Sequence, residues 1–460
     1  SIWMQWSYLT EYPGVVRSEF DESFLKLPEE VLVTVMRVHQ KQLPIEEDGK
    51  LGRHFLSIVD ADSDPKGFAS SGNAFVTNAR FADALFFLEV DLKRDLGERI
   101  DDLSHLQFQE QLGDYARKTD RICSIASAIL EEIDASVSAE SLEEACRLSK
   151  VDLLTEMVKE FTDLQGRIGG IYAARQGREE EVWKAIYDQY LPQSLEDDLP
   201  ETEGGAILSL ADRADNLAGF FLLGLEPTGS RDPFALRRAA QGIVRILFNE
   251  DRWTIPLDVE RLVRIALDAY PDEIGGDREE TAAKLLDFIS ERVRNVLETS
   301  WSFAYDEVAA AMSSGWSESL PDLRMRTAAL HDARRSREFL SILDSARRIS
   351  NITPEGFEGR VREDLLEEEQ EKRLYELGRT VRSQIAELIG EGSYERALQS
   401  FAGMAGELEK FFDEVLVNVE NQEIRENRLS VLRIVGDAVA GIGDVTKIVV
   451  DRKALDSSGR

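Results

Sequence analysis

Two helices joined by a sharp turn, in residues 205–248, constrain the fold of this chain more than any other stretch. The first helix is mostly apolar. Pro227 and Gly229 end it, because proline cannot continue a helix and glycine adopts backbone angles that other residues avoid. Asp232 is a suitable N-cap for the second helix, and Pro233 fits its first position, where no backbone donor is needed. That helix is expected over 233–249, with one apolar stripe formed by Phe234, Ala239, Ile243 and Leu247.

Apolar residues recur at helical spacing over most of the chain beyond residue 78. Residues 1–78 instead have a mixed α/β pattern, in which 55–59 (FLSIV) predicts a strand and 31–38 (VLVTVMRV) fits a strand or a buried helix. Asn78 is the expected cap of the first helix that follows. A mainly α fold with more than one domain is therefore expected for 460 residues. The helices are predicted over 79–94, 106–134, 139–160, 166–175, 179–190, 205–224, 281–298, 391–419 and 425–450.

The formal net charge of −33 bears on any nucleic-acid-binding role. Phosphate contacts dominate affinity for nucleic acids, so proteins that bind them usually have a basic surface. RNA binding by this chain would therefore depend on local patches, where a guanidinium makes paired hydrogen bonds to phosphate oxygens. The alternative is a set of solvated helices on which arginines pair with acids such as Asp332, Glu338 and Asp344. The candidate arginines are Arg324, Arg326, Arg334, Arg335, Arg337, Arg347, Arg348, Arg425 and Arg428.

Several classes of protein and of site receive no support from the sequence. No apolar run approaches the roughly 20 residues that span a membrane, and the first residues lack the features of a signal peptide. Cys123 and Cys146 favour a reduced cytosolic pair over a disulfide. The chain has no phosphate-binding glycine loop, zinc-ligand spacing or nucleophile elbow. These observations predict a cytoplasmic protein with no membrane partner.

The segment LADRADNLAGFFLLGLEPTGSRDPFALRR (210–238) resembles the hallmark of the beta subunit of bacterial-type, two-subunit glycyl-tRNA synthetase. The resemblance covers essentially the whole chain. The family's further N-terminal region is not found, so the chain resembles an N-terminally truncated member. Other segments follow in the order that the family shows: 27–44 (LPEEVLVTVMRVHQKQLP), 108–121 (FQEQLGDYARKTDR), 150–166 (KVDLLTEMVKEFTDLQG), 346–352 (ARRISNI), 411–415 and 425–429 (RENRL).

The resemblance implies four domains. His39 and Lys41, in the first of them, favour a surface or RNA-contact role over catalysis, because a lone histidine without a positioned partner is weak evidence for chemistry. The expected domains are an editing-like α/β remnant (1–78), an HD-like helical domain (79–255), a helical connector (256–330) and a DALR-type anticodon-binding helical domain (331–460).

An active HD phosphohydrolase needs a histidine, a His-Asp dipeptide and a further aspartate to hold the metal that activates water. Here Val151-Asp152 matches the dipeptide, Asp212 matches the last aspartate, and His105 is the only histidine in the domain. We therefore expect no metal in this chain. Asp212, Arg213 and Asp215 are expected to form structural ion pairs.

The turn between the two helices has two interpretations. It is either a rigid structural or subunit-docking corner, or a phosphate or RNA contact at a helix N-terminus. Asp232 at the cap opposes a phosphate there, which favours the structural interpretation. The family signature comprises Pro227, Thr228, Gly229, Ser230, Arg231, Asp232, Pro233, Arg237 and Arg238.

The resemblance implies that an alpha subunit activates glycine with ATP and Mg²⁺, and that the beta subunit binds and presents glycine tRNA in an assembly of two alpha and two beta subunits. We therefore expect no catalytic residue and no cofactor in this chain. Arg347 and Arg348 would lie at the start of the anticodon-binding domain, and Arg425 and Arg428 would reach the anticodon loop. Two alternatives remain open, namely an HD-type metal-dependent phosphohydrolase and a structural scaffold that does not bind RNA.

Overall fold

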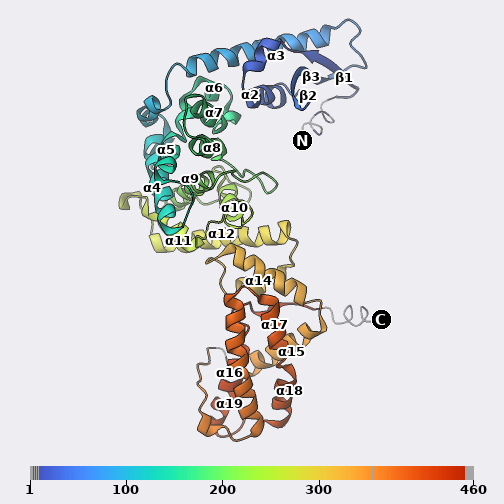
Figure 1. Cartoon of the computed structure of the whole chain (residues 1–460), viewed down its shortest axis with the longest axis vertical. Helices are drawn as coiled ribbons and strands as arrows, with labels where there is room; N and C mark the ends of the chain where they lie inside the picture. The colour runs from blue at the N-terminus through green and yellow to red at the C-terminus, as the bar shows by residue number, and fades with distance from the viewer. Residues whose placement is uncertain (1–3, 5, 7, 9, 355, 451–460) are drawn as a thin grey trace. The chain divides into compact units, whose positions relative to one another are not determined.

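Helices dominate the computed structural model, which describes residues 4, 6, 8, 10–354 and 356–450 (Figure 1). The chain divides into two compact units. The first unit comprises Ser1–Arg231 with Arg264–Arg278, and the second comprises Asp232–Val263 with Glu279–Arg460. The expected mainly α fold is confirmed. In the described part of the chain, every helix is too short or too polar to span a membrane.

The first unit begins with an antiparallel sheet of strand order β1-β3-β2. β3 (Lys50–Asp60) contains the strand expected over 55–59. It pairs with β1 (Pro13–Glu19) from Pro13↔Asp60 to Glu19↔His54 and with β2 (Leu43–Glu47) at Leu43↔Leu56. Burial alternates strictly along β1, as it does when one face of a sheet covers a core.

The ambiguous segment 31–38 is helical. α2 (Glu29–Thr34) continues as a π-helical turn over Val35–His39, and four apolar side chains of this region are fully buried. His39 ends the turn with its ring against Phe161, 5.2 Å between the ring centroids. Apolar runs of this length do not separate a strand from a buried helix by periodicity, so only packing decides between them.

The helix expected to begin at residue 79 begins eleven residues earlier. α3 (Phe68–Asp91) follows Gly67, whose φ of 68° is left-handed, and the Asp64 carboxylate accepts a hydrogen bond from the Ser70 N–H at 2.8 Å. Asn78 is therefore internal to the helix and does not cap it. Most of the residues from 68 to 77 are small or polar, and the large apolar ones, Phe68, Phe75 and Val76, are exposed, so no buried stripe marks the start of the helix.

The remaining helices of the first unit follow the predicted pattern with two interruptions. A short hairpin, β4 (Gln107–Gln109) with β5 (Gly113–Asp114), occupies the start of the helix expected over 106–134. The helix expected over 139–160 is divided by a 3-10 turn at Val151–Leu154. The helices are α4 (Tyr115–Glu132), α5 (Ala139–Leu148), α6 (Glu156–Glu160), α7 (Arg167–Arg175), α8 (Glu180–Asp188) and α9 (Glu203–Leu222).

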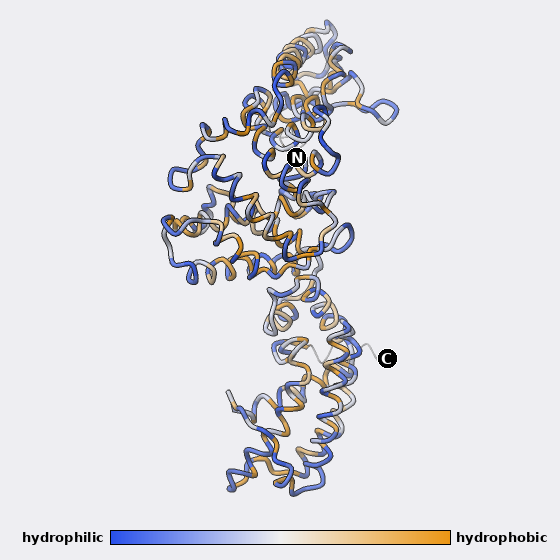
Figure 2. Tube along the Cα trace, turned by 60° about the vertical axis from the view of Figure 1, so that its left-hand side comes forward, coloured by the Kyte–Doolittle hydropathy of each residue, from blue (hydrophilic) through white to orange (hydrophobic). Residues whose placement is uncertain are grey.

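The second unit has helices and no strand in its described part, and the residues of α11 (Val259–Asp268) are divided between the two units. In Figure 2, hydrophobic and hydrophilic positions alternate along the helices, as expected when each helix buries one face. The helix expected over 391–419 is two helices that meet near Gly403. The other helices are α10 (Leu236–Leu247), α12 (Arg278–Ser300), α13 (Tyr305–Met312), α14 (Leu320–Ala333), α15 (Arg337–Ile352), α16 (Glu369–Gly390), α17 (Tyr394–Ala402), α18 (Ala405–Glu414) and α19 (Gln422–Gly436).

Candidate functional site

Three of the segments that the sequence singled out meet at a group of buried charges in the first unit. Lys118 Nζ, from α4, lies 2.9 Å from Asp212 Oδ1 and 2.7 Å from Asp215 Oδ2, both on α9. Lys150 Nζ lies 3.0 Å from Asp212 Oδ2. None of these four side chains is more than 7% exposed. Together with Arg121 they form what we call the buried charge cluster.

Arg121 and Tyr270 complete the cluster around Asp215. Arg121 Nε lies 2.6 Å from Asp215 Oδ1, and its Nη1 donates to the carbonyl of Leu112 at 3.1 Å. The Tyr270 hydroxyl donates to Asp215 Oδ1 at 2.8 Å, while its ring lies beneath the Arg121 guanidinium at 4.4 Å. Both carboxylate oxygens of Asp215 therefore face hydrogen-bond donors, which is the condition for a stable buried ion pair.

The geometry of the cluster sets the ionisation of Asp212 and Lys118. Burial disfavours an ionised carboxylate, but Lys118 and Lys150 outweigh it and hold the pKa of Asp212 below its ordinary value. Burial likewise opposes the charge on Lys118, but Asp212 and Asp215 outweigh it and raise the pKa of Lys118. Both groups are thus charged at neutral pH and stabilise each other.

Asp152 lies beside the cluster, and its pKa is shifted in the opposite direction from that of Asp212. Its Oδ2 accepts hydrogen bonds from the Gly166 N–H at 2.6 Å and the Gly169 N–H at 3.3 Å, while its Oδ1 is buried with no hydrogen-bond partner among the described residues. Burial raises the pKa of Asp152 to about 6, and the backbone donors and Lys150 only partly offset it. A Cβ at Gly169 would lie 3.2 Å from Asp152 Oδ2, so glycine permits this close approach.

The residues present do not fit a metal site of the HD type. Both carboxylate oxygens of Asp212 face lysine ammonium groups, and a cation placed between them would be repelled. Within the described residues, no group of three or more His, Cys, Asp or Glu side chains is arranged to hold a metal ion. The phosphohydrolase alternative is therefore not favoured. The sequence analysis did not single out Lys118 and Arg121. Both are buried residues of α4 that pair with the carboxylates of α9.

The turn after α9 is stabilised by its own backbone and by Asp232. Thr228 and Arg231 exchange backbone hydrogen bonds of 3.1 and 2.9 Å. Asp232 accepts from the N–H groups of Leu236 at 2.8 Å and Arg237 at 2.9 Å. Its carboxylate therefore occupies the N-terminus of α10, as the structural interpretation requires.

The second helix begins later than predicted. α10 starts at Leu236, since Ala235 has a left-handed φ of 55°, and Pro233 lies outside the helix. The Asp232 carboxylate therefore caps α10 from a position four residues before the first residue of the helix, which the sequence spacing did not predict. Most of the family signature is exposed: Thr228, Gly229, Ser230, Arg231, Pro233 and Arg238 are at the surface, and Pro227, Asp232 and Arg237 are half-buried.

Several candidate RNA-binding arginines are engaged inside the second unit. Arg326 is 5% exposed and donates to the carbonyls of Ala311 at 2.9 Å and Gly315 at 2.6 Å. Arg428 is also 5% exposed and pairs with Glu371. Arg334 binds the buried carboxylates of Asp306 and Glu307. These guanidinium groups hold the fold together.

The other candidate arginines differ in their contacts and in their exposure to solvent. Arg324 pairs with Glu250, and Arg347 donates to the carbonyl of Ile448 at 3.0 Å. Arg348 is exposed over the Phe412 ring at 5.0 Å, Arg335 is exposed and Arg425 is half-buried. The side chain of Arg337 lies outside the described part of the structure. The arginines thus do not form one continuous patch, and their binding to RNA stays a prediction.

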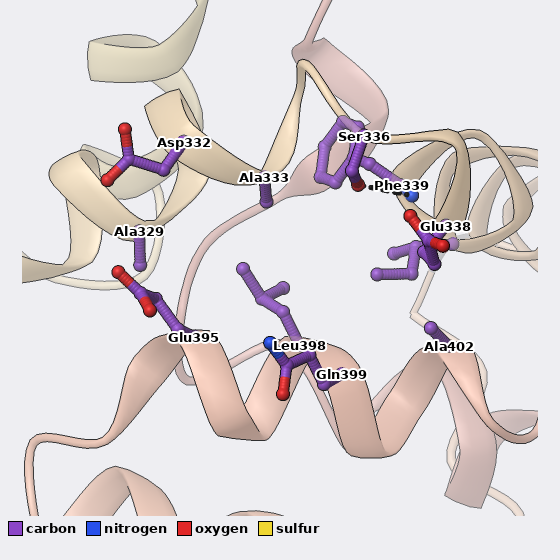
Figure 3. Close-up of a pocket in the computed structure, with 11 residues that line it drawn as sticks. Ala329, Asp332, Ala333, Ser336, Glu338, Phe339, Glu395, Leu398, Gln399 and Ala402 are labelled. Carbon is purple, nitrogen blue, oxygen red and sulfur yellow. Dashed lines mark hydrogen bonds between the residues drawn. The ribbon is translucent and has the colours of Figure 1, made fainter. Parts of the chain in front are cut away.

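A hollow beside this region is acidic (Figure 3). It has a volume of about 420 Å³ and lies between α14, α15 and α17, and its apolar lining includes Leu398 and Phe339. Three carboxylates surround it: Asp332, Glu338 and Glu395. Phosphate groups would be repelled from this hollow.

Two family models match the chain. The model described as "Glycyl-tRNA synthetase beta subunit" matches residues 2–313, and the model described as "DALR anticodon binding domain" matches residues 342–449. The first match contains the buried charge cluster and the PTGSRDP turn. The second contains α16 to α19 and most of α15.

Curated relatives agree with these matches. The chain is 37% identical over 443 residues to the glycine–tRNA ligase beta subunit of Clostridioides difficile, covering 96% of this chain and 64% of that protein. It is 39% identical over 459 residues to the protein of the same name from Acidobacterium capsulatum, with the same two coverages. The chain thus spans a little less than two thirds of the length of these relatives. It belongs to the glycyl-tRNA synthetase beta-subunit family of aminoacyl-tRNA synthetases.

Proposed function

We propose that this chain is the tRNA-binding, non-catalytic part of a glycine–tRNA ligase. The observation that carries the proposal is the match of residues 342–449 to an anticodon-binding domain, in a chain whose residues 2–313 match the beta subunit. The buried charge cluster of the first unit supports it, because the charges of the cluster are engaged in internal ion pairs and are shielded from solvent.

The division of labour follows from this assignment. An alpha subunit activates glycine with ATP and Mg²⁺ and transfers it to the tRNA that this chain presents, in a cytoplasmic assembly of two alpha and two beta subunits. Residues 79–255 keep an HD-like architecture in which lysine ammonium groups replace a metal. This chain itself holds no cofactor. Of the predicted arginines, Arg335 and Arg348 are exposed and Arg425 is half-buried, so these three are the candidates for contact with RNA.

Glycine-dependent exchange of pyrophosphate into ATP tests the division of labour. The chain alone is expected to give no exchange above background, while the alpha subunit supplies it. Addition of the chain to the alpha subunit is expected to raise the rate at which glycine tRNA is charged. Exchange by the purified chain alone would contradict the proposal, as would charging that does not depend on the chain.

A further inference from the structure

The second unit contains a basic hollow that sequence inspection did not single out. It has a volume of about 540 Å³ and lies between α16, α19 and the segment 357–362. We call it the α16–α19 hollow. The lining residues that matter here are Glu358, Arg360, Tyr375, Arg382, Arg433 and Asp437.

Segment 357–362 is fixed on α19 at both ends. Asn427, which is buried, accepts from the Arg362 N–H at 2.7 Å and donates to the Arg362 carbonyl at 3.0 Å. Arg433 donates to the carbonyl of Phe357 at 2.5 Å. Between these points a Cβ at Gly359 would lie 2.1 Å from Ser430 Oγ, so only glycine lets the segment lie this close to α19. The hollow is therefore preformed, and Asn427 gives the RENRL segment a positioning role.

The charges of the hollow are not balanced internally. Arg360 and Arg382 are exposed, and neither has a hydrogen bond or ion pair within the described residues. Arg433 is the exception, because its Nε lies 3.3 Å from Asp437. Glu358 is the remaining acid, so two free guanidinium groups face one free carboxylate. In a chain with a net charge of −33, this excess of positive charge is a local attraction for phosphate.

An aromatic ring stands beside these arginines. Tyr375, Arg379 and Arg382 are spaced four and three residues apart on α16 and so share one face of the helix. The Arg379 guanidinium lies 5.5 Å from the centre of the Tyr375 ring, and the Tyr375 hydroxyl donates to Glu363 at 3.3 Å. Tyr375 also lines the hollow, so the part of its ring that Arg379 does not cover can stack against an unpaired base.

We propose that the α16–α19 hollow binds one unpaired nucleotide of an RNA loop, with its phosphate at Arg360 and Arg382 and its base against Tyr375. Arginine suits the phosphate because its planar fork makes paired hydrogen bonds to phosphate oxygens. The volume suits a single nucleotide, since pockets for small ligands run from about 300 to 1,000 Å³. The acidic hollow of Figure 3 lacks both the arginines and a free aromatic face. The inference rests on the proposed function and names the part of the second unit that performs it.

Binding of the full chain to glycine tRNA, with variants of the hollow, tests the inference. The double substitution Arg360→Ala with Arg382→Ala is expected to weaken binding by at least about tenfold, because two charge-assisted contacts are lost. The slope of log affinity against log salt should fall by about 0.7, the value for one phosphate contact of a single strand, because both arginines contact the same phosphate. Tyr375→Leu should also weaken binding, whereas Tyr375→Phe, which keeps the ring, should not.

Arg373→Ala is the matched control. Arg373 is exposed on α16, nine residues or two and a half turns from Arg382, and so points away from the hollow. Equal losses for Arg373→Ala and for the hollow variants would overturn the inference, because binding would then follow overall charge. Unchanged binding by the double variant would overturn it while leaving the proposed function intact. A wild-type chain that does not bind glycine tRNA would overturn both.

Discussion

At the scale of single residues, the buried charge cluster shows why charged residues in family motifs need not be catalytic. Asp212 and Asp215 were expected to form structural ion pairs, and they do so with Lys118, Lys150 and Arg121. The partners could not be predicted from sequence because they come from segments about 60 to 100 residues away, which only the fold brings together. Arg213, the third residue expected in such pairs, donates to the carbonyls of Tyr190 and Pro192.

Asp212→Asn is expected to lower the free energy of unfolding by about 3–5 kcal/mol. The substitution leaves the ammonium of Lys150 buried without its carboxylate, and breaking a buried pair by removing one partner costs about that much. Chemical denaturation measures the change. Glu143→Gln, in an exposed pair with Arg147, is the control and should change stability by less than about 1 kcal/mol. Equal effects of the two substitutions would contradict the role of the cluster.

Asp152→Asn is expected to stabilise the protein at pH 7 by about 2 kcal/mol, an effect that fades as the pH falls toward 4. Burial raises the pKa of Asp152 to about 6, above the value of the unfolded chain, so its ionisation at higher pH opposes folding. Asparagine keeps an oxygen for the Gly166 N–H and carries no charge. Unfolding free energies of both proteins between pH 4 and 7 test this, and a difference that does not depend on pH would contradict it.

At the scale of elements, helices with a clear apolar stripe were predictable and their ends were not. The helix expected over 281–298 lies within α12, and that expected over 166–175 matches α7 within one residue. The start of α3, the β4–β5 hairpin and the break after α5 depend on tertiary contacts. The Asp91 carboxylate, for example, accepts from the N–H groups of Glu156 and Met157 and so fixes where α6 begins. A local sequence pattern cannot predict a helix cap whose acceptor lies 65 residues away in the chain.

The same limit applies to the candidate RNA-binding residues. Spacing identified basic helices but not which guanidinium groups reach solvent, so Arg326 and Arg428 were grouped with the exposed Arg348. The α16–α19 hollow combines a loop residue with two helices that are distant in sequence, and no motif marks it. Gly359 and Asn427 fix the backbone there, which only the structure shows.

Asp232→Ala is expected to cost about 1 kcal/mol of stability, since Asp232 caps the two first N–H groups of α10. Asp232→Asn, which keeps an acceptor, should cost much less. Thermal or chemical unfolding of the two variants makes the comparison. If both variants lose the same stability, the negative charge and not the hydrogen bonds would be the stabilising feature, and the capping account would be wrong.

At the scale of the whole molecule, strong acidity and RNA binding are compatible only if basic sites are local. The chain carries 88 Asp and Glu residues against 55 Lys and Arg residues. Many of the arginines in the second unit are neutralised internally, which leaves a small number of free guanidinium groups to attract phosphate. Repulsion from the rest of the surface then favours an RNA that presents one accessible loop over RNA in general.

The most direct test of this account is the affinity of the 460-residue chain for glycine tRNA, measured at low and at physiological salt beside a non-cognate tRNA. The account predicts tighter binding to glycine tRNA at both salt concentrations, with a shallow salt dependence that reflects only a few phosphate contacts. Equal affinity for the two tRNAs, or no binding to glycine tRNA even at low salt, would contradict it.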